Sequence, residues 1–354
     1  MTATSSPHAH NKRSTAQVMQ LVLLATLPGF IALSYNFGWG VFINLLICTL
    51  VAVASEAAIL KLRARPIGFY LSDYSAIVTA VLLGLALPPL APWWIPALGS
   101  LFAIVIAKQL YGGLGFNPFN PAMVGYVVLL ISFPVEMTRW LAPTDVLALG
   151  DAVRPWLIDS LYTVFASAPH DAITGATPLD TLKHNQGLML DQLYAEEPIF
   201  NRGAWAGAGW EWVNVGFLVG GLFLLQQRIF TWHAPVGMLA MLAMAALLGW
   251  DSGSSDSFGS PLMHLLSGAT MLGAFFIVTD PVTSATSNLG RLIYGALIGL
   301  LVYLIRNLGA YPDAVAFAVL LANFAAPLID NYTLPRSYGH KKARRATEKA
   351  EDSK

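Results

Sequence analysis

The sequence predicts an all-α integral membrane protein with about ten transmembrane helices. Its 354 residues are 56% hydrophobic and only 11% charged, whereas soluble domains carry about 25% charged residues. The mean hydropathy is +0.59. Basic and acidic residues, 20 of each, cancel to a formal net charge of zero, which gives no reason to expect nucleic acid as a partner. Most of the chain is therefore expected to lie in a bilayer.

The spans follow from the length that a helix needs to cross the hydrocarbon core, roughly 20 apolar residues. The stretches that approach this length are 17–35, 40–60, 72–90, 93–110, 119–134, 210–227, 234–250, 262–280, 291–307 and 312–330. Several are short or interrupted by proline or glycine. The first has full length and leads directly into the second, so we interpret it as a retained span rather than a cleaved signal peptide.

The basic residues predict the orientation, because they concentrate on the cytoplasmic side of membrane proteins. With the N-terminus inside, most Lys and Arg residues fall on the inner side, and the outer side keeps Arg139, Arg154, Lys183, Arg202 and Arg306. Both termini are then cytoplasmic. The predicted parts are a cytoplasmic segment (1–16), a five-helix unit (17–134), an external loop (135–209), a second five-helix unit (210–330) and a basic cytoplasmic tail (331–354).

The two five-helix units align as an internal repeat. "NPAMVGYVVLLISF" (120–133) matches "YPDAVAFAVLLANF" (311–324), and "SAIVTAVLLGLALPP" (75–89) matches "SGATMLGAFFIVTDP" (267–281), in the same order. Because five spans is an odd number, the second unit must enter the membrane inverted. Inverted repeats with broken helices usually place a cofactor or substrate site near the midplane, between the halves.

A short string in the predicted external loop is the strongest candidate site. "HDAITGATPLD" (170–180) contains Gly175, which permits unusual backbone angles, and Pro178, which ends any preceding helix. We expect the Thr177 hydroxyl to be exposed in a turn, and the residues alone also fit a plain turn. A second S-G-A-T (267–270) lies inside an apolar span, where small residues suit helix packing.

The loop string resembles the flavinylation signature D-x-x-[ST]-x-A-T. Asp171, Thr174, Ala176 and Thr177 match every fixed position, whereas six residues before Thr270 stands His264 instead of Asp. More widely the chain resembles the RnfD family of the Rnf (Rsx) electron transport complex, homologous to the NqrB component of the sodium-translocating NADH:quinone reductase. That resemblance rests on "IAKQLYGGLGFNPFNPAMVGYVVLLISFP", "DAITGATPLDT", "AGAGWEWVN", "HLLSGATMLGAFFIVTDPVTS" and "YPDAVAFAVLLANFAAPLID".

The resemblance implies a flavoprotein of the bacterial inner membrane, with the flavin loop in the periplasm. Thr177 would carry FMN through a phosphoester, and Asp171, Thr174, Gly175 and Ala176 would form the signal for a flavin transferase. A non-covalent riboflavin is a possible second cofactor, with no residues assigned. The partners would be the other subunits of a complex of about six, which passes electrons between NADH and ferredoxin while a cation crosses the membrane; flavins supply such redox chemistry.

Ionisable residues inside the membrane are candidates for an ion or flavin path, because burying them is costly. Glu56 falls in the second span, Asp73 near a span end, and Asp280 in "TDPVTSATSN". Asp280 could instead simply cap the next turn. In "NPFNP", Asn117 and Asn120 are expected as caps. The tryptophans at 205, 210 and 212 are either flavin neighbours or part of the interfacial aromatic belt.

Other chemistries lack the necessary residues. The single cysteine, Cys48, excludes a disulfide framework, a cysteine-ligated zinc and an iron–sulfur cluster held by this chain alone. No nucleophile–base set or phosphate loop is present, so the chain is not expected to catalyse a reaction alone. Two alternatives stay open: a secondary transporter or channel for a small polar solute, without flavin, and a structural scaffold.

Overall fold

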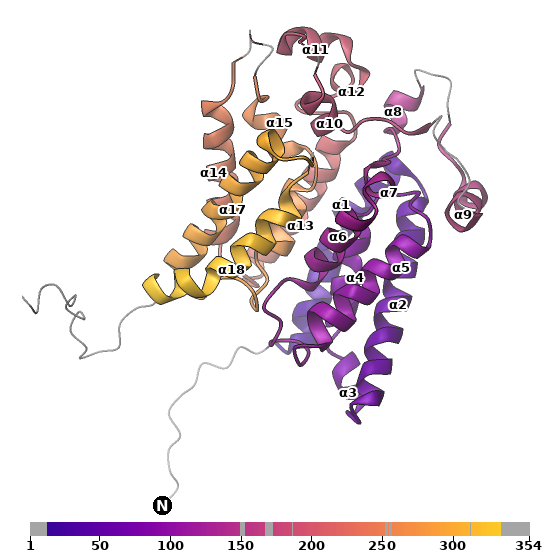
Figure 1. Ribbon diagram of the computed structural model, residues 1–354, viewed down its shortest axis with the longest axis vertical. Coiled ribbons are helices and arrows are strands. Elements are labelled where there is room, and N and C mark those ends of the chain that lie inside the picture. The colour runs from indigo at the N-terminus through magenta and orange to yellow at the C-terminus, as the bar shows by residue number, and fades with distance from the viewer. Residues whose placement is uncertain are drawn as a thin grey trace, which may run out of the picture.

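A computed structural model describes residues 13–148, 153–166, 173–185, 187–251, 254, 257–311 and 313–333. Its regular structure within these ranges is helical, apart from one isolated β-bridge between Leu141 and Thr174. Two groups of long helices stand side by side, and short helices cover one end of the pair (Figure 1). The predicted all-α class is therefore confirmed for the described residues.

The first group holds the N-terminal half of the chain. Its helices are α1 (Thr15–Phe37), α2 (Gly40–Leu62), α3 (Ile67–Leu71), α4 (Ser75–Ala86), α5 (Trp94–Leu101), the π-helix η1 (Phe102–Gln109), α6 (Pro121–Ser132) and α7 (Pro134–Thr138). The connecting segment contributes α8 (Thr144–Leu147), α9 (Leu157–Ala166), α10 (Pro178–Lys183), α11 (Leu190–Glu196) and α12 (Pro198–Asn201).

The second group holds the C-terminal half. Its helices are α13 (Trp210–Gln226), α14 (His233–Leu248), α15 (Pro261–Leu266), α16 (Thr270–Leu272), the π-helix η4 (Gly273–Ile277), α17 (Asn288–Leu308) and α18 (Val315–Thr333). We call the end of the bundle near α10–α12 the outer end. Helix α1 begins and α18 ends at the opposite, inner end (Figure 1), so the two ends of the described chain share one side.

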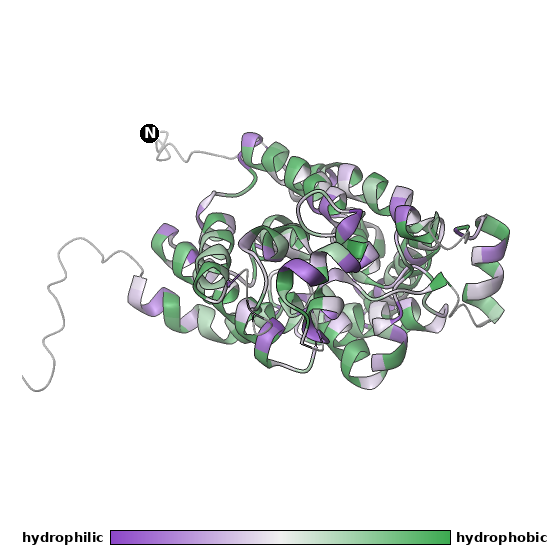
Figure 2. Ribbon diagram, turned by 90° about the horizontal axis from the view of Figure 1, so that it is seen from above, coloured by the Kyte–Doolittle hydropathy of each residue, from purple (hydrophilic) through white to green (hydrophobic). Residues whose placement is uncertain are grey.

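Four described helices are long and apolar enough to cross a membrane by length and composition: α1, α2, α17 and α18. Figure 2 shows that hydrophobic residues occur along most of the helices of the bundle. Large apolar side chains such as Leu46, Leu50 and Phe324 are 61%, 62% and 71% exposed. Apolar surface of this extent suits a multi-pass membrane protein.

Several predicted spans are shorter or divided in the structure, including the third span of each half. The stretch 72–90 yields only the 12-residue α4, because Pro88 and Pro89 follow it and prevent its continuation. The stretch 262–280 is divided into α15, α16 and η4, since Ser267 takes an extended backbone and Gly268 a left-handed one (φ +59°). Both halves thus contain a short or broken helix at their third span.

Close helix contacts depend on glycine. A Cβ on Gly220 of α13 would lie 1.9 Å from the Ala25 carbonyl oxygen of α1, and one on Gly295 of α17 would lie 2.1 Å from the Ala234 carbonyl oxygen of α14. Small residues let helix backbones approach in this way in membranes, where no hydrophobic effect drives the helices together. Helix α1 therefore joins the two halves by packing on α13, while α6 packs on α18.

Candidate functional site

Thr177 lies at the outer end, immediately before α10. Its Oγ1 accepts a hydrogen bond from the backbone N–H of Asp180 (3.2 Å) and donates one to Asp180 Oδ2 (3.3 Å). This is the arrangement of a helix N-cap, for which threonine is well suited. Thr177 keeps only 9% of its accessible surface. The expectation of an exposed hydroxyl is therefore wrong, because the hydroxyl is folded inward to cap α10.

Asp180 shares this partly buried environment. Burial raises the pKa of its carboxyl group, while the hydrogen bonds to Thr177 and the positive charges of His184 and Lys183 lower it. Burial is the larger effect, so the net direction is upward. The Thr177 hydroxyl is thus hydrogen-bonded to the Asp180 carboxyl group, and burial disfavours the charged form of that group.

The segment before Thr177 pairs with the chain that follows α7. Gly175 N donates to the Trp140 carbonyl oxygen, and Ala142 N donates to the Ile173 carbonyl oxygen, both at 3.0 Å. Gly175 does not adopt the left-handed backbone that the sequence suggested. Its small size matters instead, because a Cβ there would lie 3.0 Å from the Ala142 Cβ.

The other residues of the signature differ in their surroundings. Asp171 lies outside the described residues. Thr174 is half-buried in the bridge to Leu141, and Ala176 is exposed. Thr177 is thus the inward-facing end of a segment that is otherwise near the surface.

Lys183, the last residue of α10, fastens this helix to the second half. Its Nζ donates to the carbonyl oxygens of Arg306 (3.2 Å), Gly309 (2.5 Å) and Tyr311 (3.0 Å). These carbonyls lie at the end of α17, where the last groups lack helical partners and favour a cation. Burial lowers the pKa of Lys183, and the charge of Asp180 opposes that effect. The helix that Thr177 caps is therefore held by α17.

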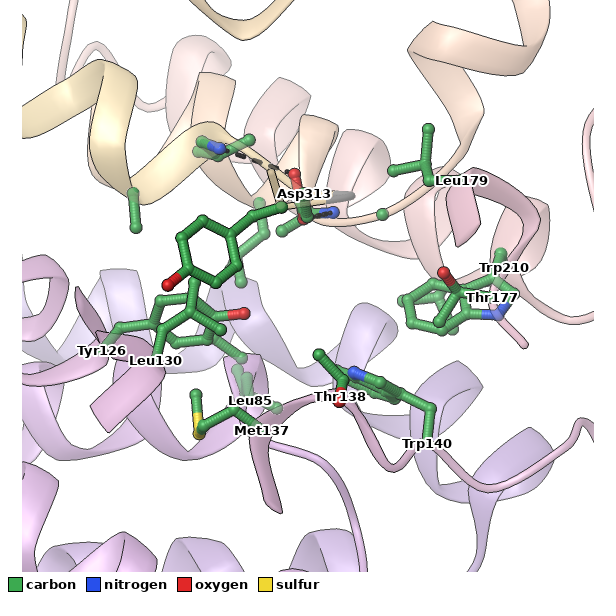
Figure 3. Close-up of a pocket in the computed structure, with 18 of the residues that line it drawn as sticks. Leu85, Tyr126, Leu130, Met137, Thr138, Trp140, Thr177, Leu179, Trp210 and Asp313 are labelled. Atoms are coloured by element: carbon green, nitrogen blue, oxygen red, sulfur yellow. Dashed lines mark hydrogen bonds between the residues drawn. The ribbon is translucent and has the colours of Figure 1, made fainter. Parts of the chain in front are cut away.

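A small cavity of about 70 Å³ lies beneath Thr177, between the two halves. Figure 3 draws Thr177 beside Trp210, with Trp140 below and Tyr126 and Asp313 on the other side. Trp140 and Trp210 are in ring contact, with centroids 4.8 Å apart. Trp210 thus joins the site as the sequence allowed. Trp205 and Trp212 are each 53% exposed and pack on each other instead.

An open groove of about 840 Å³ lies on the other side of Thr177. It is lined by Pro134, Val135, Thr138, Ala176, Asp180, Thr181, His184, Asn185, Leu188, Leu193, Glu197, Ala310 and Tyr311. Thr138, Asp180 and Tyr311 line both the groove and the small cavity. Thr177 itself lines only the small cavity, whereas its neighbours Ala176 and Asp180 line the groove.

A second polar site lies at the inner end. Lys108 Nζ donates to both carboxylate oxygens of Glu56 (2.7 and 3.0 Å) and to Ser75 Oγ (2.7 Å). Gln109 Nε2 also donates to Glu56 Oε1 (2.6 Å), and Ser75 Oγ donates to Asp73 Oδ1 (2.5 Å). Two of the three predicted path residues, Glu56 and Asp73, are thus joined through a buried lysine. Buried charges require such partners.

Asp280 lies in a large cavity at the same end. Its carboxylate accepts hydrogen bonds from Val282 N (3.1 Å) and Thr283 Oγ1 (3.0 Å), so it caps the following turn as the simpler interpretation expected. The cavity measures about 540 Å³ and is also lined by Ser75, Lys108 and Asn120. Asp280 and the Lys108 network therefore face one space, although Asp280 does not bond to Lys108.

The "NPFNP" segment forms part of the wall of this cavity. Asn120 caps α6 by accepting from Ala122 N and Met123 N (3.1 and 3.3 Å), as predicted. Asn117 does not cap a helix; its amide donates to the Phe119 carbonyl oxygen (3.0 Å) within the turn.

A network similar to that of Lys108 lies near the outer end, around Arg306. Its guanidinium donates to the His264 carbonyl oxygen (2.8 Å), Thr270 Oγ1 (2.9 Å) and Asp313 Oδ1 (3.2 Å). Arg306 is only 3% exposed. From the sequence it was assigned to the outer-side charges, and its burial was not expected. Thr270 is fully buried and donates to the carbonyl oxygens of His264 and Ser267. The second S-G-A-T string is therefore buried as predicted, but it breaks the span and joins this polar network instead of simply packing helices together.

The site residues that sequence reasoning missed include Asp180, Lys183, Arg306 and Asp313. The signal that could have found Arg306 is a lone arginine inside an apolar helix. Metal ligands do not gather in the described part of the chain: no group of three or more His, Cys, Asp or Glu side chains there could hold an ion.

These features define a class: a helical membrane protein with polar sites between two halves, one at each end. The chain belongs to the NQR2, RnfD, RnfE family, whose profile matches residues 2–339. A relative from Ectopseudomonas mendocina is 61% identical over 338 residues, covering 96% of both chains. One from Cellvibrio japonicus is 59% identical over 345 residues, covering 97% of this chain and 96% of its own. Both relatives are named as the D component of an ion-translocating oxidoreductase complex.

Proposed function

We propose that this chain is the D component of an ion-translocating oxidoreductase complex and carries FMN on Thr177. The observation that carries the proposal is the flavinylation signature at 171–177 in a chain 61% identical to a relative of that name. The complex would pass electrons between NADH and ferredoxin and move a cation across the bacterial inner membrane. By the family resemblance, the complete complex would contain about six subunits, this chain included.

The surroundings of Thr177 suit this role in part. A flavin ring does not fit the cavity of about 70 Å³, but the adjoining groove of about 840 Å³ lies within the usual size range of ligand sites, roughly 300–1,000 Å³. We therefore assign the ring to the groove, between Thr181, His184 and Tyr311. When bound, FMN would supply one-electron redox chemistry. The chain's own residues hold the attachment point: Thr177 caps α10, and Lys183 fixes α10 to α17.

The burial of Thr177 implies an order of events. A flavin transferase needs access to the hydroxyl, yet Thr177 is 9% exposed once α10 is docked. Attachment would therefore precede docking of α10, or would require its release. An ester oxygen can still accept the hydrogen bond from Asp180 N, so the cap would survive the modification, whereas the hydrogen bond to the Asp180 carboxylate would be lost.

The inner cavity is the proposed site of the second, non-covalent flavin, riboflavin. Its volume of about 540 Å³ falls within the usual range for a ligand pocket, and its walls combine apolar side chains with a few polar ones. Asn117 Oδ1 is buried without a hydrogen-bond partner in the described structure, and Asn117 lines the cavity. Such an acceptor could receive a hydrogen bond from a ring N–H or a ribityl hydroxyl.

Glu56, Asp73 and Asp280 are the proposed ion path at the inner end. The Asp73–Ser75–Lys108–Glu56 chain of hydrogen bonds leads from the start of α4 to a buried carboxylate. Lys108 also lines the cavity that contains Asp280. A cation entering this region would compete with Lys108 for Glu56, which is how a buried pair can respond to an ion.

We further propose ten spans in two inverted repeats, with both termini cytoplasmic and the flavin loop periplasmic. The two buried cations support the repeat. Lys108 and Arg306 each lie near the end of the fourth predicted span of their half, and each bonds a hydroxyl near the start of the third, Ser75 or Thr270. They lie at opposite ends of the bundle, as inversion requires.

The test of the attachment is peptide mapping of the chain purified after co-expression with a flavin transferase. We expect FMN on the peptide that contains Thr177, and none on the peptide that contains Thr270. Asp171→Ala is expected to lower the modified fraction if the carboxylate belongs to the recognition signal. A chain without flavin would instead favour a transporter that uses the inner cavity for a small polar solute.

A further inference from the structure

Helix α9 (Leu157–Ala166) is set apart from the rest of the loop by its position. It lies beside the outer ends of α2 and α5, and Figure 1 views it nearly end-on, whereas the long helices run along the vertical axis. Its axis therefore crosses the direction of the bundle helices. A helix in this position would lie parallel to the membrane surface.

Contacts on one side hold α9 to the bundle. Its Val164 is fully buried, and the Val164 carbonyl oxygen accepts a hydrogen bond from Trp93 N (3.1 Å). Just before α9, the Arg154 guanidinium donates to the Tyr35 carbonyl oxygen and lies 5.9 Å from the centre of the Tyr35 ring. The segment 154–166 is consequently tied to the outer ends of α1, α2 and α5, and within α9 Ser160 and Val164 are the buried residues.

The free side of α9 is apolar. Ile158, Tyr162 and Phe165, spaced to share one face, are 79%, 67% and 54% exposed. Asp159 is the only charged residue in the helix. An exposed face of this kind is costly in water, and the described chain places no other element over it.

The neighbourhood of α9 has the composition of a membrane interface. Tryptophan and tyrosine rings are exposed at this level on several elements: Tyr35, Trp39, Trp93, Trp156 and Tyr162. Trp and Tyr are enriched where hydrocarbon meets the headgroups. Helix α2, on which α9 packs, exposes Phe42, Leu46 and Leu50 along one of its faces. Large apolar side chains are thus exposed both on α9 and on the long helix that holds it.

We propose that α9 is an in-plane helix whose apolar face lies in the outer leaflet of the bilayer. Its occupant is lipid hydrocarbon at the boundary with the headgroups, the usual environment of an amphipathic interfacial helix. Helix α9 would thereby tie the middle of the loop 135–209 to the membrane.

Site-directed fluorescence quenching in the assembled complex, reconstituted in vesicles, tests this placement. Cys48→Ala removes the only cysteine, and a fluorophore is then attached at single cysteines in the α9 variants Ile158→Cys and Phe165→Cys. Leu50→Cys on α2 is the lipid reference, and Ala195→Cys, on the exposed side of α11, is the water reference. Quenchers are nitroxide-labelled lipid in the bilayer and iodide in the outer solution.

We expect probes at 158 and 165 to lose fluorescence to nitroxide lipid, as at 50, and to be protected from iodide. The probe at 195 should respond in the opposite way. Quenching of both α9 probes by iodide would overturn the proposal, because the helix would then stand in water. Protection from both quenchers would also overturn it, because a partner protein or a second copy would cover the face. Asp159→Cys, on the same helix but off the apolar face, should be the α9 position most accessible to iodide.

Discussion

Thr177 Oγ1 and Asp180 Oδ2 lie 3.3 Å apart, so the hydroxyl proposed to carry FMN is hydrogen-bonded to a carboxylate. Burial raises the pKa of Asp180 above its ordinary value of 3.8. A raised carboxyl pKa means that the neutral form stabilises the fold, and this contribution is lost as pH rises through the folded-state pKa.

Asp180→Asn is therefore expected to raise the unfolding temperature at pH values above the raised pKa, where the wild-type side chain is charged. The gain should shrink as pH falls through the raised pKa. Thermal unfolding in detergent, measured from below to above this pKa, gives the gain in unfolding temperature at each pH. The control is Asp191→Asn, which changes an exposed carboxylate on α11. A gain in unfolding temperature that does not depend on pH would contradict a raised pKa for Asp180 in the folded protein.

Lys183→Met should loosen α10, because three carbonyl oxygens at the end of α17 lose their donor. Leaving such groups without a partner costs about 1–3 kcal/mol. Hydrogen exchange in residues 178–183 should become faster. If attachment requires α10 to be undocked, the rate of flavinylation should rise as well. Unchanged exchange in this segment would rule out the docking role of Lys183.

The buried pair between Glu56 and Lys108 predicts a double-mutant result. Glu56→Gln or Lys108→Met alone leaves one buried charge without its partner, at a cost of about 3–5 kcal/mol. The double variant removes both charges, so its loss of unfolding free energy should be clearly smaller than the sum of the single losses. Additive losses would mean that the two side chains are not coupled in the folded protein.

Gly220→Ala should disrupt the packing of α1 on α13, because the new Cβ would lie 1.9 Å from a backbone oxygen that cannot move aside. We expect a loss of about 1–3 kcal/mol or more, as for other overpacked sites, and a lower yield of folded protein. Gly68→Ala in α3 has no atom within 4 Å of the added Cβ and should unfold like the wild type.

Composition and hydropathy were enough to predict the all-α membrane class, because both depend on each residue's own transfer free energy. The cap of α6 by Asn120 was also predictable, because capping depends on residues that are neighbours in the sequence. Local rules also predicted that the segment around Thr270 is buried, but not that it bonds to Arg306.

The site features that sequence reasoning missed involve residues far apart in sequence. Lys108 meets Glu56 from 52 residues away, and Lys183 meets Gly309 from 126 residues away; no local pattern encodes either contact. Thr177 was expected to be exposed because its neighbours are small. It is buried because residues 140–142 pair with 173–175 and α10 docks on α17, which only the tertiary structure reveals.

The central claim, a covalent flavin on Thr177, is tested most directly by in-gel fluorescence under ultraviolet light after denaturing electrophoresis. The chain co-expressed with a flavin transferase should give a fluorescent band, and Thr177→Val should abolish it. Thr270→Val should leave the band fluorescent in the fraction of the variant that folds. A dark wild-type band, or a Thr177→Val band as bright as the wild type, would contradict the account.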